Sequence, residues 1–566
     1  MLLLAVALLT CSLLLWLAGV FLLEALGLQN RNPFLAFWAG MFPIGLTGLL
    51  LSLFVPLQGA AAALCFWASG LGLWRLWRMG FRETGLSVPG TALTLVLIAL
   101  LAYKTGYAEF KDGGGGDTPG YHLNLVRYLH DYGTVVGIGN LQFRLGMNST
   151  WHALAALFEQ GLLLGRSAYL MQGLLGLGAV GWCVAEVTTS AVIWRRLYAV
   201  VLIPMVAYYL RDMRPSLYYD NAALFLCAVV FSICLRILLQ KDNRTVMAHC
   251  VLVLTATAFL LKPLNPFFVS GCVGIAAWGV CQDSPRGRLR RLALVCVLPG
   301  FAALVWVAKN VLLTGYPVYP STIFPFPVDW RMAEAKAREC LECILGWARM
   351  PNGLYHESLR QGLGFWFPSW FERQIQSFEM WYNGFAPLGL GCIVWLLACV
   401  RQRGAVVWCI LGLTLASLAG WFGSAPEIRF GSAYFWIFLA AGVPCLFRNQ
   451  TASDVTPRVR VVLWALGASL LGLLVFFYQR GSHHSERDWL VPAPAVLGNA
   501  VPARIQPDDG AEPFDVFAPR GEGKGCANGP VPCTSEPNGG FCLRDPQQWA
   551  NGFRDCQSHF AGYVSP

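Results

Sequence analysis

The sequence has few charged residues, since Asp, Glu, Lys and Arg together make up only 13% of its 566 positions. Soluble domains carry roughly a quarter charged residues, so this composition excludes most soluble enzymes, coiled coils and disordered chains. The chain also lacks a Walker A motif, a Rossmann glycine pattern, an HExxH helix and a nucleophile elbow in a suitable context. The usual motifs of soluble, nucleotide-dependent catalysis are therefore missing.

Long apolar runs are what the chain has instead. Hydrophobic residues make up 56% of the sequence, and the mean hydropathy is +0.53. Runs of about 17 to 25 apolar residues can cross a bilayer as helices, so we predict an all-α polytopic membrane protein with about 14 transmembrane helices. The expected spans are 3–27, 34–54, 59–74, 90–108, 167–192, 197–210, 219–239, 246–261, 264–281, 292–308, 383–400, 405–421, 431–447 and 461–478.

The net charge of +10 comes from short clusters of Lys and Arg between the apolar runs, which is typical of membrane topology and not of a nucleic-acid footprint. Every second loop is basic, as at Arg75 and Arg78 or at Arg290 and Arg291, and we place these loops in the cytoplasm. The bulky loops then lie outside, and no sizeable cytoplasmic domain remains for a nucleotide. An energy-rich substrate is expected to arrive through the membrane.

The alternation of basic loops divides the chain into six parts. We predict N-terminal transmembrane helices at 1–108, a first extracytoplasmic loop with interfacial helices at 109–166, transmembrane helices at 167–308, a second large extracytoplasmic loop at 309–382, C-terminal transmembrane helices at 383–478 and a small extracytoplasmic domain at 479–566.

Four of the nineteen cysteines stand apart, because they lie in the polar, Gly- and Pro-rich tail. An extracytoplasmic tail meets oxidising conditions, so we predict two disulfides, with open connectivity, and a zinc site is the alternative. The four residues are Cys526, Cys533, Cys542 and Cys556. Cys340 and Cys343 form a C-x-x-C pair in the second large loop, which indicates either a redox role or two positions on adjacent helical turns.

The first large loop is the richest in candidate chemistry. Glycines 113–116 lead to Asp117, and the apolar spacing over 118–132 predicts an amphipathic helix that lies in the membrane interface. A second helix is expected after Asn148 or Ser149, either of which can cap it. Together the two helices are expected to wall a cavity at the membrane surface.

Asp117 is the candidate catalytic residue. A carboxylate at the end of a helix just above the bilayer can act as a general base toward a hydroxyl group. The alternative is that Asp117 only caps the helix that begins at Thr118 and Pro119, and both roles are compatible.

Further polar residues are candidates for substrate binding. In the same loop, Arg144 and Asn148 could bind phosphate or sugar or form a structural network, and His122 could orient Asp117, contact phosphate or be solvated. Others recur at the outer ends of spans, where cations oppose the positive-inside trend and could neutralise a phosphate group, with snorkelling as the alternative for the lysines. These are Asp220, Lys262, Lys309, Glu427 and Arg429.

Four blocks of sequence carry a resemblance. They are DTPGYHLNLVRYLHDYGTVVGIGNLQFRLGMNS, KNVLLTGYPVYPS, APEIRFG and PVPCTSEPN with its downstream GF. In this order they resemble an uncharacterised family of bacterial multi-pass membrane proteins. The architecture of many spans and a large first outer loop with an Asp looks like the glycosyltransferase C superfamily, whose members take sugars from polyprenyl-phosphate donors.

This resemblance implies that Asp117 is the catalytic acidic residue of a membrane glycosyltransferase. Many superfamily members have a paired acidic motif in this loop, whereas here Asp112 and Asp131 stand at other spacings. A strict acidic pair is therefore absent, so the resemblance leaves open whether a divalent cation is a cofactor, and no metal ligands are assigned.

The expected function is sugar transfer from a polyprenyl-phosphate donor to an envelope glycan, lipid or protein on the outer face of a bacterial inner membrane. Membrane lipids are expected partners, and nucleic acid is not. The alternatives are a transporter or flippase of lipid-linked sugars, a glycan polymerase or ligase, and a non-catalytic scaffold.

Overall fold

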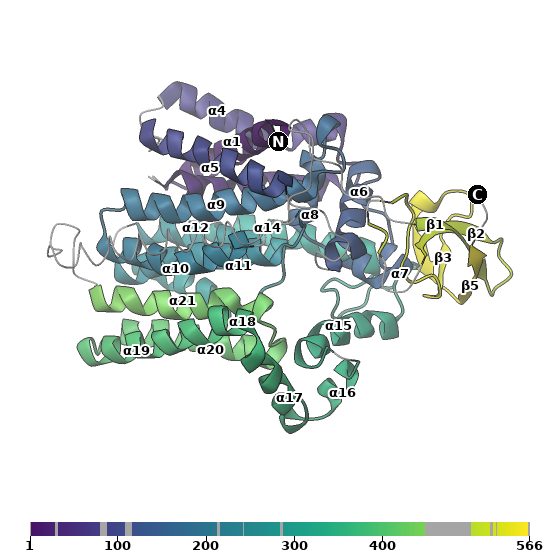
Figure 1. Cartoon of the computed structure of the whole chain (residues 1–566). Helices are drawn as coiled ribbons and strands as arrows, with labels where there is room; N and C mark the ends of the chain where they lie inside the picture. The colour runs from purple at the N-terminus through teal and green to yellow at the C-terminus, as the bar shows by residue number, and fades with distance from the viewer. Residues whose placement is uncertain are drawn as a thin grey trace.

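The structure is a computed structural model, and it describes residues 2–28, 32–79, 88–107, 116–211, 215–240, 243–283, 287–351, 353–447, 500–520, 525–527 and 529–563. It is mostly helical, with a small β-rich domain at the C-terminal end (Figure 1). The long helices are α1 (Leu2–Ala25), α2 (Pro33–Leu51), α4 (Trp67–Met79), α5 (Val88–Tyr107), α9 (Ser167–Thr189), α10 (Ile193–Arg211), α11 (Asp220–Leu239), α12 (Arg244–Leu261), α13 (Pro266–Asp283), α14 (Arg288–Thr314), α15 (Glu334–Arg349), α17 (Leu363–Gln376), α19 (Ala386–Arg401), α20 (Ala405–Ser424) and α21 (Ile428–Phe447).

Shorter elements connect these helices. They are α3 (Gly59–Leu64), the π-helical turn η2 (Thr118–His122), α6 (Leu123–Asp131), α7 (Ile138–Leu141), the 3₁₀ turns η3 (Phe143–Gly146) and η4 (Gly161–Leu163), α8 (Thr150–Phe158), α16 (Tyr355–Arg360), α18 (Phe378–Met380) and the π-helical turn η5 (Trp381–Phe385).

Ten helical segments among the described residues are long and apolar enough to cross a membrane, which supports a multi-pass membrane protein. They match ten of the predicted spans, but the predicted total of 14 is not confirmed. The run 59–74 is broken into α3 and α4, because the chain turns at Cys65 and Phe66. Helices form at two further predicted spans, as α5 and α13, while 461–478 lies outside the described residues.

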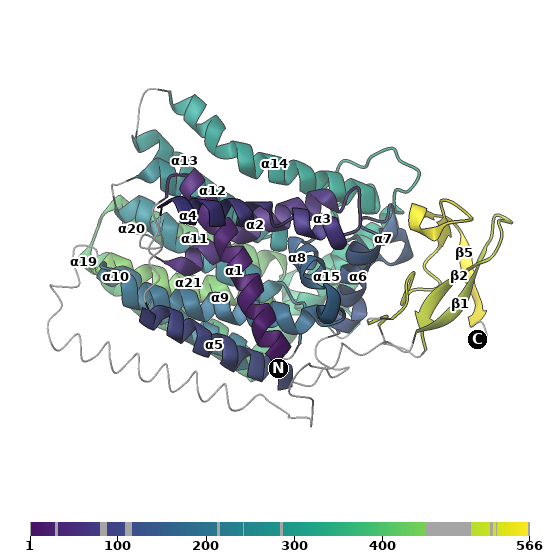
Figure 2. The ribbon, with the colours of Figure 1, turned by 90° about the horizontal axis from the view of Figure 1, so that it is seen from above.

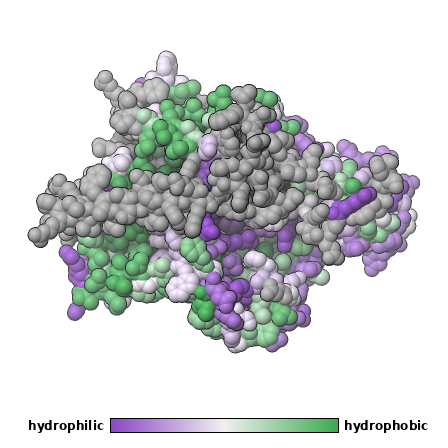
Figure 3. Space-filling view, viewed as in Figure 1, coloured by the Kyte–Doolittle hydropathy of each residue, from purple (hydrophilic) through white to green (hydrophobic). Residues whose placement is uncertain are grey.

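The long helices lie side by side as a bundle, with α11 near its centre (Figures 1 and 2). Helix α11 is buried along almost its whole length, whereas α14, α19 and α20 leave many large apolar side chains exposed. In the space-filling view, hydrophobic residues gather over the bundle and hydrophilic residues over the C-terminal domain (Figure 3). Apolar side chains exposed along the bundle are what a lipid-facing surface requires.

Helices occur in the first loop where they were predicted, but their surroundings differ from the prediction. Residues 118–131 form η2 and α6, and α8 begins after Ser149, whose hydroxyl accepts a hydrogen bond from the Trp151 N–H at 3.1 Å. Every residue of α8 is buried, because α2, α6 and α9 pack around it. α8 is therefore a core helix and not the interfacial helix expected from its apolar stripe.

The tail forms a small β domain held by two disulfides. Strand β1 (Ala500–Pro507) pairs antiparallel with β2 (Phe514–Pro519) and β5 (Ser558–Tyr563), and β3 (Phe541–Leu543) pairs with β4 (Phe553–Asp555). Cys526 bonds to Cys533 and Cys542 to Cys556, so the predicted disulfides are confirmed and the zinc alternative is wrong. Cys340 and Cys343 are both free and lie one turn apart on α15.

The segments predicted to be extracytoplasmic meet at one end of the bundle. The η2 turn contacts the chain before α11, where the Thr118 and Ser216 hydroxyls lie 3.3 Å apart. Lys336 of α15 contacts both the first loop and the tail, through the carbonyls of Asn140 and Gly539. The loops at this end therefore form one continuous layer over the bundle, and the tail lies beyond it (Figure 1).

Helices α1 and α2 cross at unusually close range, and this crossing generates a prediction. A Cβ atom on Gly40 would lie 1.7 Å from the Leu15 carbonyl oxygen, and one on Gly19 would lie 1.6 Å from that of Ala36. Overpacking a core usually costs about 1–3 kcal/mol, and backbone atoms yield less than side chains. We expect Gly40→Val to lower the unfolding temperature of the purified protein, measured in detergent.

Gly412→Val is the matched control, because Gly412 also lies in a long apolar helix and has no atom within 4 Å of its Cβ position. Equal unfolding temperatures for the two variants would contradict the close α1–α2 crossing.

Candidate functional site

Asp117 lies at the start of the η2 turn, and its side chain faces two arginines. It makes no capping hydrogen bond to the turn. Instead, Oδ1 lies 3.5 Å from Arg144 Nη1 and Oδ2 lies 3.4 Å from Arg429 Nη1. The carboxylate is 23% exposed, so it is partly open to solvent. The sequence predicted all three residues as site residues, and the structure brings them together.

Arg429 reaches Asp117 from the first turn of α21 and is surrounded by aromatic rings. Its guanidinium carbon lies 4.8 Å from the Phe430 ring centre, 5.4 Å from that of Trp347 and 5.8 Å from that of Tyr218. Aromatic faces attract a cation and fix its position. The buried Arg429 Nε has no hydrogen-bond partner among the described residues, so one donor remains for a ligand.

Lys262 and Asp220 form an ion pair next to Arg429. Lys262 follows the end of α12, and its Nζ lies 3.7 Å above the Phe430 ring centre. Burial lowers the pKa of Lys262, although the nearby Asp220 carboxylate opposes this shift. Lys262 and Arg429, which the sequence had placed at the ends of different spans, thus both lie close to the Phe430 ring.

Glu427 also lies in this region, two residues before Arg429. Burial raises the pKa of its carboxyl group, and the positive charges of Arg373 and Arg429 oppose that rise. Its backbone carbonyl accepts a hydrogen bond from Trp421 Nε1 at 2.8 Å, which holds the short turn between α20 and α21. Glu427 thus lies near the arginines, but the carboxylate that contacts Arg429 is that of Asp117.

Three tyrosines line the site, and sequence reasoning missed them. Tyr218 lies beside the backbone of Asp117, and the side chains of Tyr121 and Tyr219 lie next to each other. Burial raises the pKa of all three phenols, so they remain protonated hydrogen-bond donors at neutral pH. Tyr218 and Tyr219 directly precede Asp220, a predicted site residue, and this neighbourhood is the sequence signal that could have identified them.

His122 points away from the carboxylate and into the core. Its Nδ1 lies 2.5 Å from Nε2 of His152, which the sequence analysis had not selected. Both rings are buried, and burial lowers the pKa of each, to about 3 for His152. The pair is therefore neutral at physiological pH, and it joins η2 to α8.

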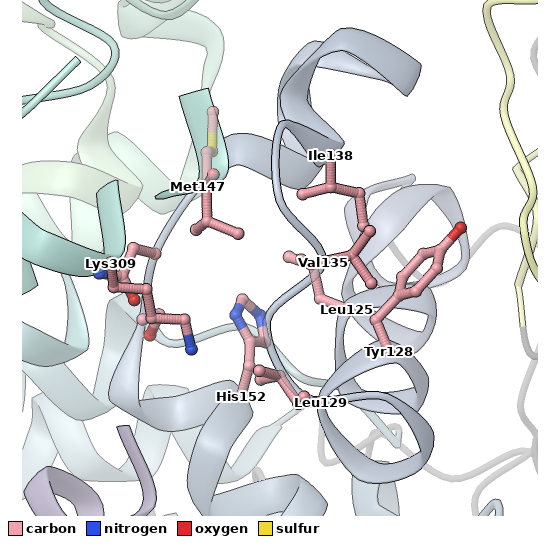
Figure 4. A pocket seen from close by; sticks show the side chains of 12 residues that line it. Leu125, Tyr128, Leu129, Val135, Ile138, Met147, His152 and Lys309 are labelled. Carbon is pink, nitrogen blue, oxygen red and sulfur yellow. The ribbon is translucent and has the colours of Figure 1, made fainter. Parts of the chain in front are cut away.

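Lys309 and Asn148 belong to a second cluster on the other side of the histidine pair. Lys309 is only 2% exposed, and its Nζ donates to Ser52 Oγ at 2.9 Å. Asn148 Nδ2 donates to the Trp306 carbonyl at 3.2 Å, while its Oδ1 has no partner among the described residues. Lys309 and His152 share a pocket of about 20 Å³ with apolar side chains (Figure 4). A cavity of that size holds a single water molecule.

A larger, mostly apolar cavity of about 220 Å³ opens beside Lys262. It lies between the start of α11, the α12–α13 turn, α15 and the ends of α20 and α21. Lys262 and Asn265 supply its polar lining, and Trp421, Phe430 and Tyr434 supply aromatic faces. The cavity therefore places an apolar volume next to the cations of the site.

One face of α15 closes the site opposite η2. Cys343 lies beside the Arg144 side chain, Ile344 lines the 220 Å³ cavity and Trp347 faces Arg429. Cys340 and Cys343, which carry free thiols, therefore belong to the helix that forms this side of the site. No group of three or more His, Cys, Asp or Glu side chains among the described residues could hold a metal ion, and Asp112 lies outside that part of the chain. The divalent cation stays a prediction.

The fold and this site define a multi-pass helical membrane protein with a cluster of ion-paired residues at one end of its bundle. The chain belongs to the family described as "Domain of unknown function (DUF8201)", which its residues 1–436 match. No curated protein and no solved structure gives a significant match to the chain. The matched residues include Asp117, Arg144, Lys262 and Arg429, and the disulfide-linked tail follows them.

The partial exposure of the Asp117 ion pairs predicts how substitutions in the site affect the stability of the folded protein. Partly exposed ion pairs contribute about 0–1 kcal/mol each, so Asp117→Asn is expected to change the unfolding temperature little. His152→Ala removes the partner of a buried histidine, which costs about 1–3 kcal/mol, and is expected to lower the unfolding temperature clearly. Thermal unfolding of both purified variants checks this contrast. Equal destabilisation by the two changes would show that Asp117 has a structural role.

Proposed function

We propose that this protein transfers a sugar from a polyprenyl-phosphate donor to a cell-envelope acceptor on the outer face of a bacterial inner membrane. The observation that carries this proposal is the Asp117 carboxylate between Arg144 and Arg429, beside Lys262 and an apolar cavity. Sugar transfer from a lipid phosphate requires a general base for the acceptor hydroxyl, cations for the phosphate and an apolar volume for the lipid chain.

In the proposed reaction, Asp117 accepts the proton of an acceptor hydroxyl. The hydroxyl oxygen forms a bond to the anomeric carbon, the bond from that carbon to the phosphate oxygen breaks, and the electron pair leaves with the polyprenyl phosphate. Attack opposite the leaving group inverts the anomeric centre. Partial exposure of Asp117 leaves room for the hydroxyl to approach its free lone pairs.

Arg144, Arg429 and Lys262 stabilise the charge that develops on the departing phosphate. Fixed cations aimed at such a charge are usually the largest contribution to catalysis. The unpartnered Nε of Arg429 offers a further donor, and the guanidinium fork suits phosphate oxygens. Lys309, which the sequence suggested for the same task, contacts Ser52 in the second cluster, so Lys262 takes its place in this proposal.

The 220 Å³ cavity is the proposed position of the first part of the isoprenoid chain. Its aromatic and aliphatic lining suits an apolar chain, and Lys262 lies at the end nearest Arg429 and Asp117. A chain that leaves this cavity along α20 or α13 would enter the lipid, because both helices are exposed on their outer faces.

The test is the surface glycan profile, by mass spectrometry, of cells that carry Asp117→Asn, compared with wild type and a deletion strain. Loss of a general base usually costs about 10²–10⁴-fold in rate, so a defined sugar is expected to disappear as it does in the deletion strain. Asp515→Asn is the matched control, since Asp515 is a carboxylate of the tail that pairs with Arg504 far from the site.

Membrane levels of the proteins must be equal in all strains. A normal glycan profile in the Asp117→Asn strain would remove the base from the proposal and favour transport or scaffolding. A missing sugar would identify the donor.

A further inference from the structure

The tail domain contacts both loop segments that supply the Asp117–Arg144 pair. On the Asp117 side, the Ala527 N–H donates to the Pro119 carbonyl at 2.7 Å, two residues after Asp117. A Cβ atom on Gly525 would lie 2.3 Å from that same carbonyl oxygen, so the chain approaches η2 as closely as a backbone can. The Cys526–Cys533 disulfide fixes this segment of the tail.

Helix α6, which continues η2, is held by the same part of the tail. Arg127 Nη1 donates to the Gly529 carbonyl at 2.6 Å, and the Cys533 N–H donates to the Tyr128 hydroxyl at 3.1 Å. Both contacts lie at or within the loop that the disulfide closes. The disulfide-closed loop therefore contacts η2 at Pro119 and α6 at Arg127 and Tyr128.

On the Arg144 side, the contact is made by a tail carboxylate. The Glu536 side chain lies beside the backbone N–H of Phe143, the residue before Arg144. Burial raises the pKa of Glu536, while the positive charges of Lys336 and Arg144 oppose that rise. Thr534 donates to the Leu141 carbonyl at 2.8 Å, just before the η3 turn. Glu536 and Thr534 thus fix the start of η3.

We infer that the tail is a positioning domain for the site, in which Thr534, with Glu536 beside it, and the Cys526–Cys533 loop hold η3 and η2 so that Arg144 meets Asp117. Glu536 acts through the Phe143 backbone and is a positioning residue. The inference concerns the geometry of the site and does not depend on the proposed sugar transfer.

Cys343 provides a readout that is independent of catalysis. Its thiol is partly exposed and lies beside the Arg144 side chain, so we expect displacement of Arg144 to uncover it. Cys340 lies one turn away on α15 and is fully buried, so it reports whether the fold is intact. The measurement is the rate of maleimide labelling of each cysteine, by peptide mass spectrometry, on the full-length protein in lipid nanodiscs.

Glu536→Ala is expected to raise the labelling rate of Cys343 by about fivefold or more, the factor that corresponds to the loss of one net hydrogen bond, while Cys340 stays protected. Glu536→Gln keeps an oxygen that can accept from Phe143 and is expected to label like wild type. Glu512→Ala is the matched control, because Glu512 is an exposed glutamate of the same domain. Arg144→Ala sets the upper limit of the labelling rate.

A second pair of variants keeps the test decisive if Glu536→Ala does not fold. Removing the Cys526–Cys533 disulfide by a double Ala substitution is expected to accelerate Cys343 labelling more than removal of Cys542–Cys556, which lies farther along the tail. Wild-type labelling of Cys343 in Glu536→Ala and in the Cys526/Cys533 variant would overturn the inference. Because labelling needs no turnover, failure of the sugar-transfer proposal would leave this result unaffected.

Discussion

The ion pairs of Asp117 with Arg144 and Arg429 join three distant segments at the end of the bundle that carries the large loops. The three residues come from η2, η3 and the first turn of α21, so the pairs require that distant parts of the chain meet. Each ion pair is partly exposed and contributes little to folding by itself. The geometry must instead be imposed by the surroundings, which are the aromatic rings around Arg429, the histidine pair behind η2 and the tail above it.

Two polar clusters with different properties lie on either side of the His122–His152 pair. The outer cluster contains paired charges and is open to solvent, while the inner cluster contains Lys309, whose nearest polar partner is the Ser52 hydroxyl. Charged groups without a counter-charge are costly to bury, so the inner cluster suits neutral hydrogen bonds and one water molecule. This division explains why residues that look equivalent in sequence, such as Lys262 and Lys309, have different surroundings.

Much of the architecture could be predicted from the sequence, because long apolar runs and tail cysteines follow strong physical rules. The spans at 167–192 and 219–239 and the two disulfides are examples. The prediction of one continuous span at 59–74 is wrong, because the run is largely apolar and hydropathy does not reveal the chain turn between α3 and α4. The burial of α8 and the contact between His122 and His152 depend on tertiary packing, and residues 30 positions apart carry no local signal of it.

The candidate site was partly predictable for a different reason. Cations near the predicted outer ends of spans oppose the usual charge bias, and this selected Arg429 and Lys262 without any knowledge of their partners. The tyrosines and Glu536 could not be selected in this way, since their types are common in loops and only their contacts set them apart. The tail itself was predicted to be a domain, but its contact with residues next to Asp117 and Arg144 emerges only from the fold.

The balance of charge in the outer cluster bears on the proposed reaction. Three cations, Arg144, Arg429 and Lys262, contact two carboxylates, Asp117 and Asp220, so the ion-paired cluster carries an excess of one positive charge. A polyprenyl-phosphate donor is a diester with one ionised oxygen, and the leaving group is a monoester that approaches a dianion at neutral pH. In the same step Asp117 becomes neutral as it accepts the proton, which raises the excess positive charge by one. The charge of the cluster therefore rises as the negative charge of the leaving group grows, and this is the condition under which fixed cations stabilise a transition state more than a ground state.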